Sequence, residues 1–415
     1  MISDLATTKP RAVVKPTPKR ANWLQRLQRR EALLIPLGIA LISRIIVLVA
    51  ADLILRFGLQ RLQLKLLHVR HPQPFIGPLE VWQRKDALWY IIIAQAGYNY
   101  SPVAQSRANF FPLYPALIYL VAPVAKLLHS AEPYAVAGMA ISWVSFAIAC
   151  VLLYQIALRR FGKGVAIGAI TLLCVFPFSF YYGAAYTESI YLVLAAGAFL
   201  AVERGNWWIA ATLAGVASAS RPPGLLIGAC VALAYFIDWM RTRHPLRLDV
   251  LALALTPLGT LSYMIYCYVR WGDPLAYIKT SRAGWNGGHL QIGGVRYVAH
   301  VLRHPISWIG TRDPDHILAF FAIMVMLVFL AGTLLVWRLL GPVYALFTLA
   351  SILAPILDFP SANSLGRYLS VIFPIFIVAA YVLRDHPRLR WTLYIVSLLL
   401  LVPFAVYFIA GYGLS

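Results

Sequence analysis

Acidic residues are scarce in this sequence: only 15 of its 415 residues are Asp or Glu, against 36 Lys and Arg, and all charged residues together make up 12%. Soluble domains carry about 25% charged residues, so the composition excludes an ordinary soluble protein. Hydrophobic residues account for 61% of the chain. We therefore expect an all-α polytopic membrane protein, whose apolar runs cross the bilayer as helices.

A separate basic domain is also lacking. The net charge of +21 would suggest nucleic-acid binding in a soluble protein, but no compact basic region lies outside the apolar segments. The basic residues lie in short loops instead, where they fix topology by the positive-inside rule. We therefore expect a membrane protein with no nucleic-acid partner.

Cysteine is rare, and the four cysteines all fall inside apolar runs without a CxxC spacing: Cys150, Cys174, Cys230 and Cys267. This pattern predicts neither a disulfide framework nor a cysteine-based metal site. The sequence also has no nucleotide-cofactor motif and no His and Asp cluster with ligand spacing. The cofactor is therefore unknown, with a divalent metal neither indicated nor excluded.

The segment 1–31 lacks the features of a signal peptide, because it is polar and basic and the apolar run that follows it is too long. It predicts a disordered cytoplasmic tail. Long apolar runs then recur along the chain, and we expect about ten to twelve transmembrane helices. The runs lie at about 32–57, 134–158, 165–184, 186–203, 207–240, 250–270, 318–340, 342–358, 366–383 and 391–413. The run 207–240 is too long for one span and breaks at 220–224, SRPPG.

The placement of Arg and Lys predicts an asymmetric layout with two long extracytoplasmic loops. These loops are 58–110, within a membrane catalytic module at 32–270, and 271–317, which precedes the C-terminal transmembrane helices at 318–415. The proline-rich segment 111–128 is expected to enter the membrane without crossing it. We expect an integral multi-pass protein, in the plasma membrane if bacterial, with its active site on the extracytoplasmic face.

One apolar segment in the first external loop is too short to span and begins with a carboxylate. It is KDALWYIIIAQAGY, residues 85–98. It predicts an amphipathic helix on the membrane, with Asp86 at its head. Asp86 is a candidate general base, kept ionised by Arg84 and Lys85. The alternative is that Asp86 is the N-cap of this helix.

Ionisable residues within apolar runs are costly, so each is a candidate functional residue. Arg44 suits an anionic group, or else pairs with polar groups on neighbouring helices. Glu188, with Tyr186 before it, lies at the outer end of a run, where the alternative is a helix N-terminus. Arg221 in SRPPG and Arg367 in SLGRYLSVIFP lie at outer edges, against the positive-inside trend, and suit bidentate phosphate binding.

These segments resemble a known family when taken in order. KDALWYIIIAQAGY followed by NFFPLYPALIYL is similar to the first luminal loop and following helix of the PIG-V-like mannosyltransferases, and YTESIY, SRPPG and GRYLSVIFP follow in the family's order. The resemblance covers most of 35–380. One departure is that family members often have Trp directly before the acid, where this chain has Lys85, with Trp82 further upstream.

The resemblance implies a GT-C fold and a glycosyltransferase that uses a polyprenyl- or dolichyl-phosphate-linked sugar donor. It implies that Asp86 corresponds to the family's acidic residue in the first external loop. Together with the ionisable candidates named above, the resemblance predicts a set of substrate-binding residues. These are Arg44, Tyr186, Glu188, Arg221, Trp285, Arg367 and Tyr368.

We therefore expect an inverting transfer of a hexose, mannose in the first place, from a polyprenyl-phosphate-linked donor to an extracytoplasmic lipid or glycan acceptor. One alternative is a lipid or polysaccharide transporter (flippase). The other is an enzyme like an O-antigen ligase or polymerase, whose key residues would be His289, His300 and His304 in the second external loop.

Overall fold

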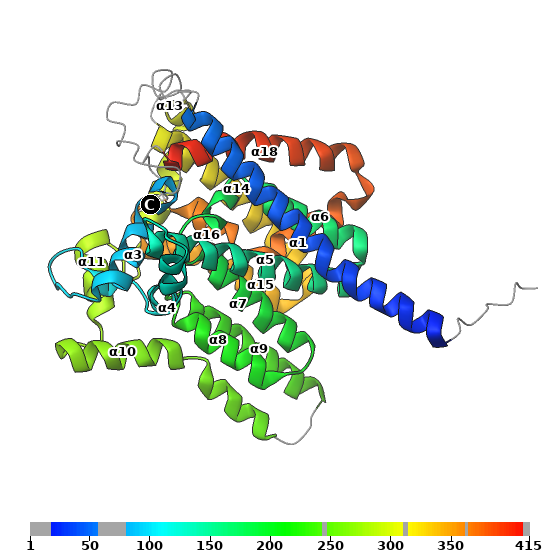
Figure 1. Cartoon of the computed structure of the whole chain (residues 1–415), viewed down its shortest axis with the longest axis horizontal. Helices are drawn as coiled ribbons and strands as arrows, with labels where there is room; N and C mark the ends of the chain where they lie inside the picture. The colour runs from blue at the N-terminus through cyan, green and yellow to red at the C-terminus, as the bar shows by residue number, and fades with distance from the viewer. Residues whose placement is uncertain (1–17, 57–79, 243–246, 310–313, 362–363, 410–415) are drawn as a thin grey trace, which may run out of the picture.

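The structure is a computed structural model that describes residues 18–56, 80–242, 247–309, 314–361 and 364–409. Within these ranges every regular element is a helix, and the helices form one bundle (Figure 1). The expected stretches 1–17 of the tail and 58–79 of the first external loop lie outside the described residues. The α-helices are α1 Pro18–Arg56, α3 Asp86–Ala96, α4 Leu113–Leu127, α5 Pro133–Phe161, α6 Lys163–Val175, α7 Glu188–Glu203, α8 Trp207–Ser218, α9 Gly224–Thr242, α10 Leu258–Trp271, α11 Ala276–Trp285, α12 Gly293–Arg303, α13 Pro305–Ile309, α14 Pro314–Leu340, α15 Pro342–Asp358, α16 Leu365–Ser370, α17 Phe373–Val382 and α18 Pro387–Ile409. The short 3₁₀ helices are η1 Glu80–Gln83, η2 Arg107–Asn109, η3 Ser179–Tyr182, η4 Leu248–Leu255 and η5 Leu383–Asp385.

The all-α, multi-span fold is confirmed, but fewer helices than expected are long enough to cross a membrane. Among the described residues, five helices pass by length and composition, or six if η4 and α10, bent by 45°, form one span. The other apolar runs are divided or shortened, as where α16 ends at Ser370 and α17 begins at Phe373, with Pro374 in its first turn. The expected ten to twelve crossings therefore stay a prediction.

The start of α1 corrects the expected tail. The helix begins at Pro18, so 18–31 is helical rather than part of a disordered segment. The reason is local composition, because 19–31 is rich in Arg, Leu and Gln, which are strong helix formers. Proline at the first position also suits a helix start, since its missing N–H has no partner there anyway.

The expected break at 220–224 is confirmed as the turn between α8 and α9. The neighbouring helix α10 crosses α8 so closely that only glycine fits at the contact. A Cβ built at Gly259 would lie 2.3 Å from the carbonyl oxygen of Gly215 and 2.4 Å from the amide nitrogen of Ala219. Small residues of this kind let helix backbones approach closely in membrane proteins. This crossing fixes the position of the turn that carries Arg221.

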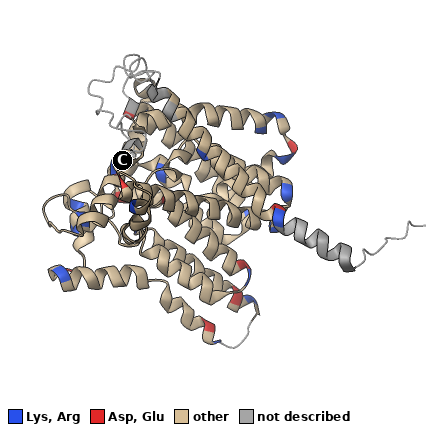
Figure 2. Cartoon of the chain, in the orientation of Figure 1, with Lys and Arg blue, Asp and Glu red and all other residues tan. Residues whose placement is uncertain are grey.

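Charged residues gather at the ends of the helices, and the middle of the bundle is mostly uncharged (Figure 2). At one end, the loops expected to be cytoplasmic are joined by ion pairs. Arg160 pairs with Glu203 at 2.6 Å, and Lys163 pairs with Glu31 at 2.7 Å. These contacts bring α1, α5, α6 and α7 together there, while the orientation of the bundle in a membrane stays a prediction.

Helix α3 is not amphipathic, which corrects another expectation. It buries Tyr90, Ile91 and Ile93, and it packs against α4 and α5. Its exposed side is also largely apolar, since Leu88 is 47% and Ile92 40% exposed. A short helix that is apolar on both sides has no polar face to present to water. The segment 85–98 therefore carries Asp86 on a helix that packs into the bundle.

The Gly259 crossing gives a stability prediction. Gly259→Ala should lower the free energy of unfolding by about 1–3 kcal/mol, because the added methyl group forces α10 away from α8. The change is measured as a lower thermal unfolding temperature of the protein in detergent. The control is Gly164→Ala, since a Cβ at Gly164 meets no atom within 4 Å. Equal unfolding temperatures for the two variants would contradict the close crossing.

Candidate active site

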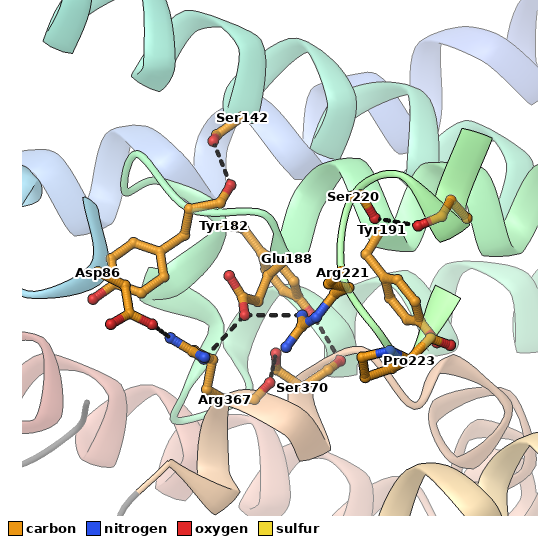
Figure 3. A network of polar contacts seen from close by, with 12 residues as sticks. Asp86, Ser142, Tyr182, Glu188, Tyr191, Ser220, Arg221, Pro223, Arg367 and Ser370 are labelled. Carbon is orange, nitrogen blue, oxygen red and sulfur yellow. Dashed lines mark hydrogen bonds and ion pairs between the residues drawn. The ribbon is translucent and has the colours of Figure 1, made fainter. Parts of the chain in front are cut away.

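Four side chains of alternating charge form one buried chain of ion pairs, which we call the four-charge network (Figure 3). Arg367 Nη1 lies 2.5 Å from Asp86 Oδ2, and Arg367 Nε lies 3.1 Å from Glu188 Oε1. Arg221 Nη1 donates to the same Glu188 oxygen at 3.0 Å. The structure thus brings together four of the residues that the sequence nominated.

Each member of the network comes from a different segment. Asp86 and Glu188 are the first residues of α3 and α7, where the positive end of the helix dipole favours a carboxylate. Arg221 lies in the turn between α8 and α9, and Arg367 lies in α16. The alternative reading of Asp86 as an N-cap is wrong, because Lys85 occupies that position without a side-chain capping bond.

Close packing fixes α16 and therefore Arg367. A Cβ built at Gly366 would lie 2.3 Å from a ring atom of Phe178, so glycine is needed for this approach. The hydroxyl of Tyr182 donates to the carbonyl oxygen of Ser370 at 2.5 Å, and the Ser370 hydroxyl donates to the carbonyl oxygen of Arg367 at 2.6 Å (Figure 3). The guanidinium of Arg367 is thus held by its backbone as well as by its ion pairs.

The turn with Arg221 is tied to α4 and α7. The backbone N–H of Leu113 donates to the carbonyl oxygen of Ala219 at 3.0 Å. The Tyr191 hydroxyl donates to the carbonyl oxygen of Pro223 at 3.3 Å. The Arg221 guanidinium lies 5.3 Å from the Tyr191 ring centre. Tyr191 is not among the predicted site residues, although it follows Glu188 by three residues and so shares its helix face.

The two predicted tyrosines cover the guanidinium groups. The Arg367 guanidinium lies 5.4 Å from the ring centre of Tyr186 and 5.3 Å from that of Tyr368, and Arg221 lies 4.9 Å from Tyr368. These are cation–π distances. The Tyr186 hydroxyl donates to the carbonyl oxygen of Arg84 at 3.1 Å. Tyr186 therefore links the network to the residues just before Asp86.

The network is largely shielded from solvent, yet it is not saturated. The side chain of Glu188 is 0% exposed and that of Asp86 is 16% exposed. Burial alone would lower the pKa of Arg221, but the carboxylate of Glu188 raises it above its ordinary value. Glu188 Oε2 is buried and has no hydrogen-bond partner. An orphaned acceptor of this kind costs about 1–3 kcal/mol and points to a ligand or water that donates to it.

Arg44 is not brought into this network. Its guanidinium donates to the carbonyl oxygen of Ser179 at 2.5 Å and to the Ser179 hydroxyl at 3.2 Å, and it lies 4.9 Å from the ring centre of Phe146. It therefore satisfies the broken backbone between α6 and α7. This is the internal pairing that the sequence left open as the alternative.

Trp285, in the segment 271–317 that is expected to be the second external loop, packs in an aromatic group, and among the described residues no hydrogen bond or cation–π contact joins it to the four charges. Its ring centre is 5.8 Å from that of Trp89 and 5.7 Å from that of Phe110. Trp89 belongs to α3, the helix that begins at Asp86. Trp285 thus packs against the helix of the site rather than against its charges.

The histidines of the segment 271–317, expected to be the second external loop, make other contacts than with the network. His289 contacts the carbonyl oxygen of Gly287 at 3.0 Å, and the rings of His300 and His304 lie 5.1 Å apart. Among the described residues, no group of three or more His, Cys, Asp or Glu side chains is placed to hold a metal ion. The charged chemistry of the described chain is therefore concentrated at Asp86, Glu188, Arg221 and Arg367.

The comparisons with known proteins point the same way. Residues 72–269, just under half of the chain, match the family described as Mannosyltransferase (PIG-V). This segment includes Asp86, Glu188 and Arg221 but ends before Arg367. No curated protein matches the sequence.

Solved structures match this chain at low sequence identity. ArnT from Cupriavidus metallidurans, solved with undecaprenyl phosphate, is 14% identical over 88% of this chain and 62% of its own, with a TM-score of 0.52. AglB, an oligosaccharyltransferase from Archaeoglobus fulgidus, is 14% identical over 94% of this chain and 56% of its own, with a TM-score of 0.46. The chain therefore spans about three fifths of the length of ArnT.

The family match covers the segments that carry three of the four charges, and the fold is similar to that of ArnT. The chain is therefore similar to the PIG-V mannosyltransferases over residues 72–269.

Proposed function

We propose that the chain is a membrane glycosyltransferase that moves a hexose, mannose in the first place, from a polyprenyl-phosphate-linked donor to an acceptor on the extracytoplasmic face. The observation that carries this proposal is the four-charge network within a PIG-V-like GT-C protein. It contains a carboxylate for proton transfer and guanidinium groups for a phosphate.

Asp86 is the proposed general base. One of its oxygens, Oδ2, accepts from Arg367, and its side chain keeps some exposure, so Oδ1 can receive an acceptor hydroxyl. In the transfer, the acceptor oxygen attacks the anomeric carbon of the donor sugar. The bond from that carbon to the phosphate oxygen breaks, and the hydroxyl proton passes to Asp86. Attack from the face opposite the phosphate inverts the anomeric centre.

Arg367 and Arg221 are the proposed ligands of the leaving phosphate. Each guanidinium has five N–H donors, and within the network Arg367 and Arg221 each donate one hydrogen bond to a carboxylate, through Nη1 in both cases. The remaining donors suit phosphate oxygens. The shared fold with ArnT, which was solved with undecaprenyl phosphate, supports a polyprenyl phosphate as the carrier.

Glu188 is the proposed ligand of the sugar. Its buried Oε2 lacks a donor, and a sugar hydroxyl would supply one. Tyr186 and Tyr368, whose rings flank Arg367, offer apolar faces beside this oxygen. The family description supports mannose as the sugar.

The decisive experiment is a donor assay on purified protein. Polyprenyl-phosphate-mannose should be consumed in the presence of a mixed lipid and glycan acceptor extract, about tenfold or more faster than polyprenyl-phosphate-glucose, because hydrogen bonds to hydroxyls discriminate between epimers. Release of polyprenyl phosphate is measured by thin-layer chromatography. Consumption of neither donor would contradict the proposal, as would flipping of a labelled lipid without any transfer.

Replacing the proposed base should abolish transfer. Asp86→Asn keeps the shape of the side chain but cannot accept the acceptor proton, so kcat should fall roughly 10²–10⁴-fold. The matched control is Asp385→Asn, which removes a carboxylate that is 72% exposed in η5 and pairs with the adjacent Arg384. The control should keep wild-type activity, and transfer by Asp86→Asn near the control rate would remove Asp86 from the mechanism.

The histidines of the second external loop should be dispensable. His289, His300 and His304 are all exposed, and none contacts the four-charge network. A variant with all three changed to Gln should therefore transfer sugar at close to the wild-type rate in the same assay. If that variant is inactive while Asp86→Asn is active, a mechanism like that of an O-antigen ligase fits better.

A further inference from the structure

Lys85 has a backbone conformation that lysine rarely adopts. Its φ is 59° and its ψ is −120°, and the N–H of Ala87 donates to the carbonyl oxygen of Arg84. This is a type II′ turn with Lys85 at its second position, where glycine is favoured because the position needs a positive φ. Strained positions held by the surrounding structure cluster at functional sites.

The side chain of Lys85 is half-buried, but its ammonium makes no ion pair with any described residue. Burial lowers the pKa of Lys85, and the nearby carboxylates of Asp315 and Asp86 only partly offset this effect. A cation in this position would be stabilised by an additional negative charge. Each arginine of the four-charge network, by contrast, already has a carboxylate partner.

The charges of the site show why a further cation matters. Asp86 and Glu188 together carry two negative charges, and Arg221 and Arg367 carry two positive charges, so the network is neutral by itself. A phosphodiester that links a sugar to a polyprenyl chain is an anion. Bringing an anion into a shielded, neutral site is unfavourable unless a cation accompanies it.

We propose that the Lys85 ammonium binds the phosphate of the lipid-linked donor, and that this contact accounts for a lysine at a turn position suited to glycine. The inference rests on the proposed function, since it assigns a further ligand to the same substrate.

The test compares three variants of the purified full-length protein with polyprenyl-phosphate-mannose as donor. Lys85→Gly relieves the turn and removes the charge, so its unfolding temperature should be equal to or above that of the wild type. Its KM for the donor should rise about 10- to 100-fold, the range expected for one charge-assisted hydrogen bond. Lys85→Met should raise KM equally without the gain in stability. Lys85→Arg should stay within a few-fold of the wild type.

His129→Gly is the matched control. His129 also has a positive φ, 56°, but lies at the end of α4 and is exposed. This variant should gain stability with no change in KM. If Lys85→Gly keeps the wild-type KM for the donor, or changes kcat and the acceptor KM instead, the inference is wrong.

A binding measurement separates this inference from the proposed function. The unfolding temperature of the wild type should rise with added polyprenyl phosphate, and the shift should be lost in Lys85→Met. If no donor supports transfer but this shift is present and depends on Lys85, the phosphate contact stands and the proposed reaction fails. If the shift is the same in both proteins, the phosphate contact is wrong whatever the activity.

Discussion

The bridge that Arg367 makes between Asp86 and Glu188 is the interaction on which the rest of the site depends. It joins Asp86 on α3 to Arg367 on α16, 281 positions apart, and Arg367 also pairs with Glu188 on α7. Removing one partner of a buried pair costs about 3–5 kcal/mol because the remaining charge stays buried. The bridge therefore couples the ends of three helices, and no member can move without exposing the charge of another.

The same bridge leaves the site incomplete in a specific way. The charges cancel within the network, but one oxygen of Glu188 has no donor and the ammonium of Lys85 has no ion-pair partner among the described residues. A ligand that combines a hydroxyl with an anionic group would satisfy both. The apolar and aromatic surroundings, with Tyr186 and Tyr368 over the guanidinium groups, raise the energetic weight of each contact because they exclude water.

Much of the fold and part of the site could be predicted from the sequence. The all-α architecture follows from the lengths of the apolar runs, and the turn at 220–224 follows from its two prolines. Asp86, Glu188, Arg221 and Arg367 stand out because charges are expensive in an apolar chain. Burying Arg44 costs as much free energy, yet its partner is the backbone carbonyl of Ser179. The sequence does not show which backbone carbonyls a helix break leaves free to accept from a charged side chain. For the same reason the sequence could not tell that Trp285 packs on Trp89 rather than on the network. Contacts between distant segments depend on how the helices cross, and the close approach of Gly259 to Gly215 is an example.

Lys85 shows where local sequence rules and the structure disagree. Turn preferences favour glycine at its position, and a non-glycine residue there costs on the order of 1–3 kcal/mol. The strained residue directly precedes Asp86, the first residue of α3. The strained turn therefore determines the position of the Asp86 carboxylate. If the Lys85 side chain made no functional contact, this strain would lower the stability of the fold without any compensating interaction. The half-buried ammonium lies beside a neutral network, where it supplies positive charge for an anionic substrate. Binding of that substrate would compensate for the strain. The turn and the four-charge network are therefore parts of one proposed binding site, in which backbone strain places a charge that has no ion-pair partner among the described residues.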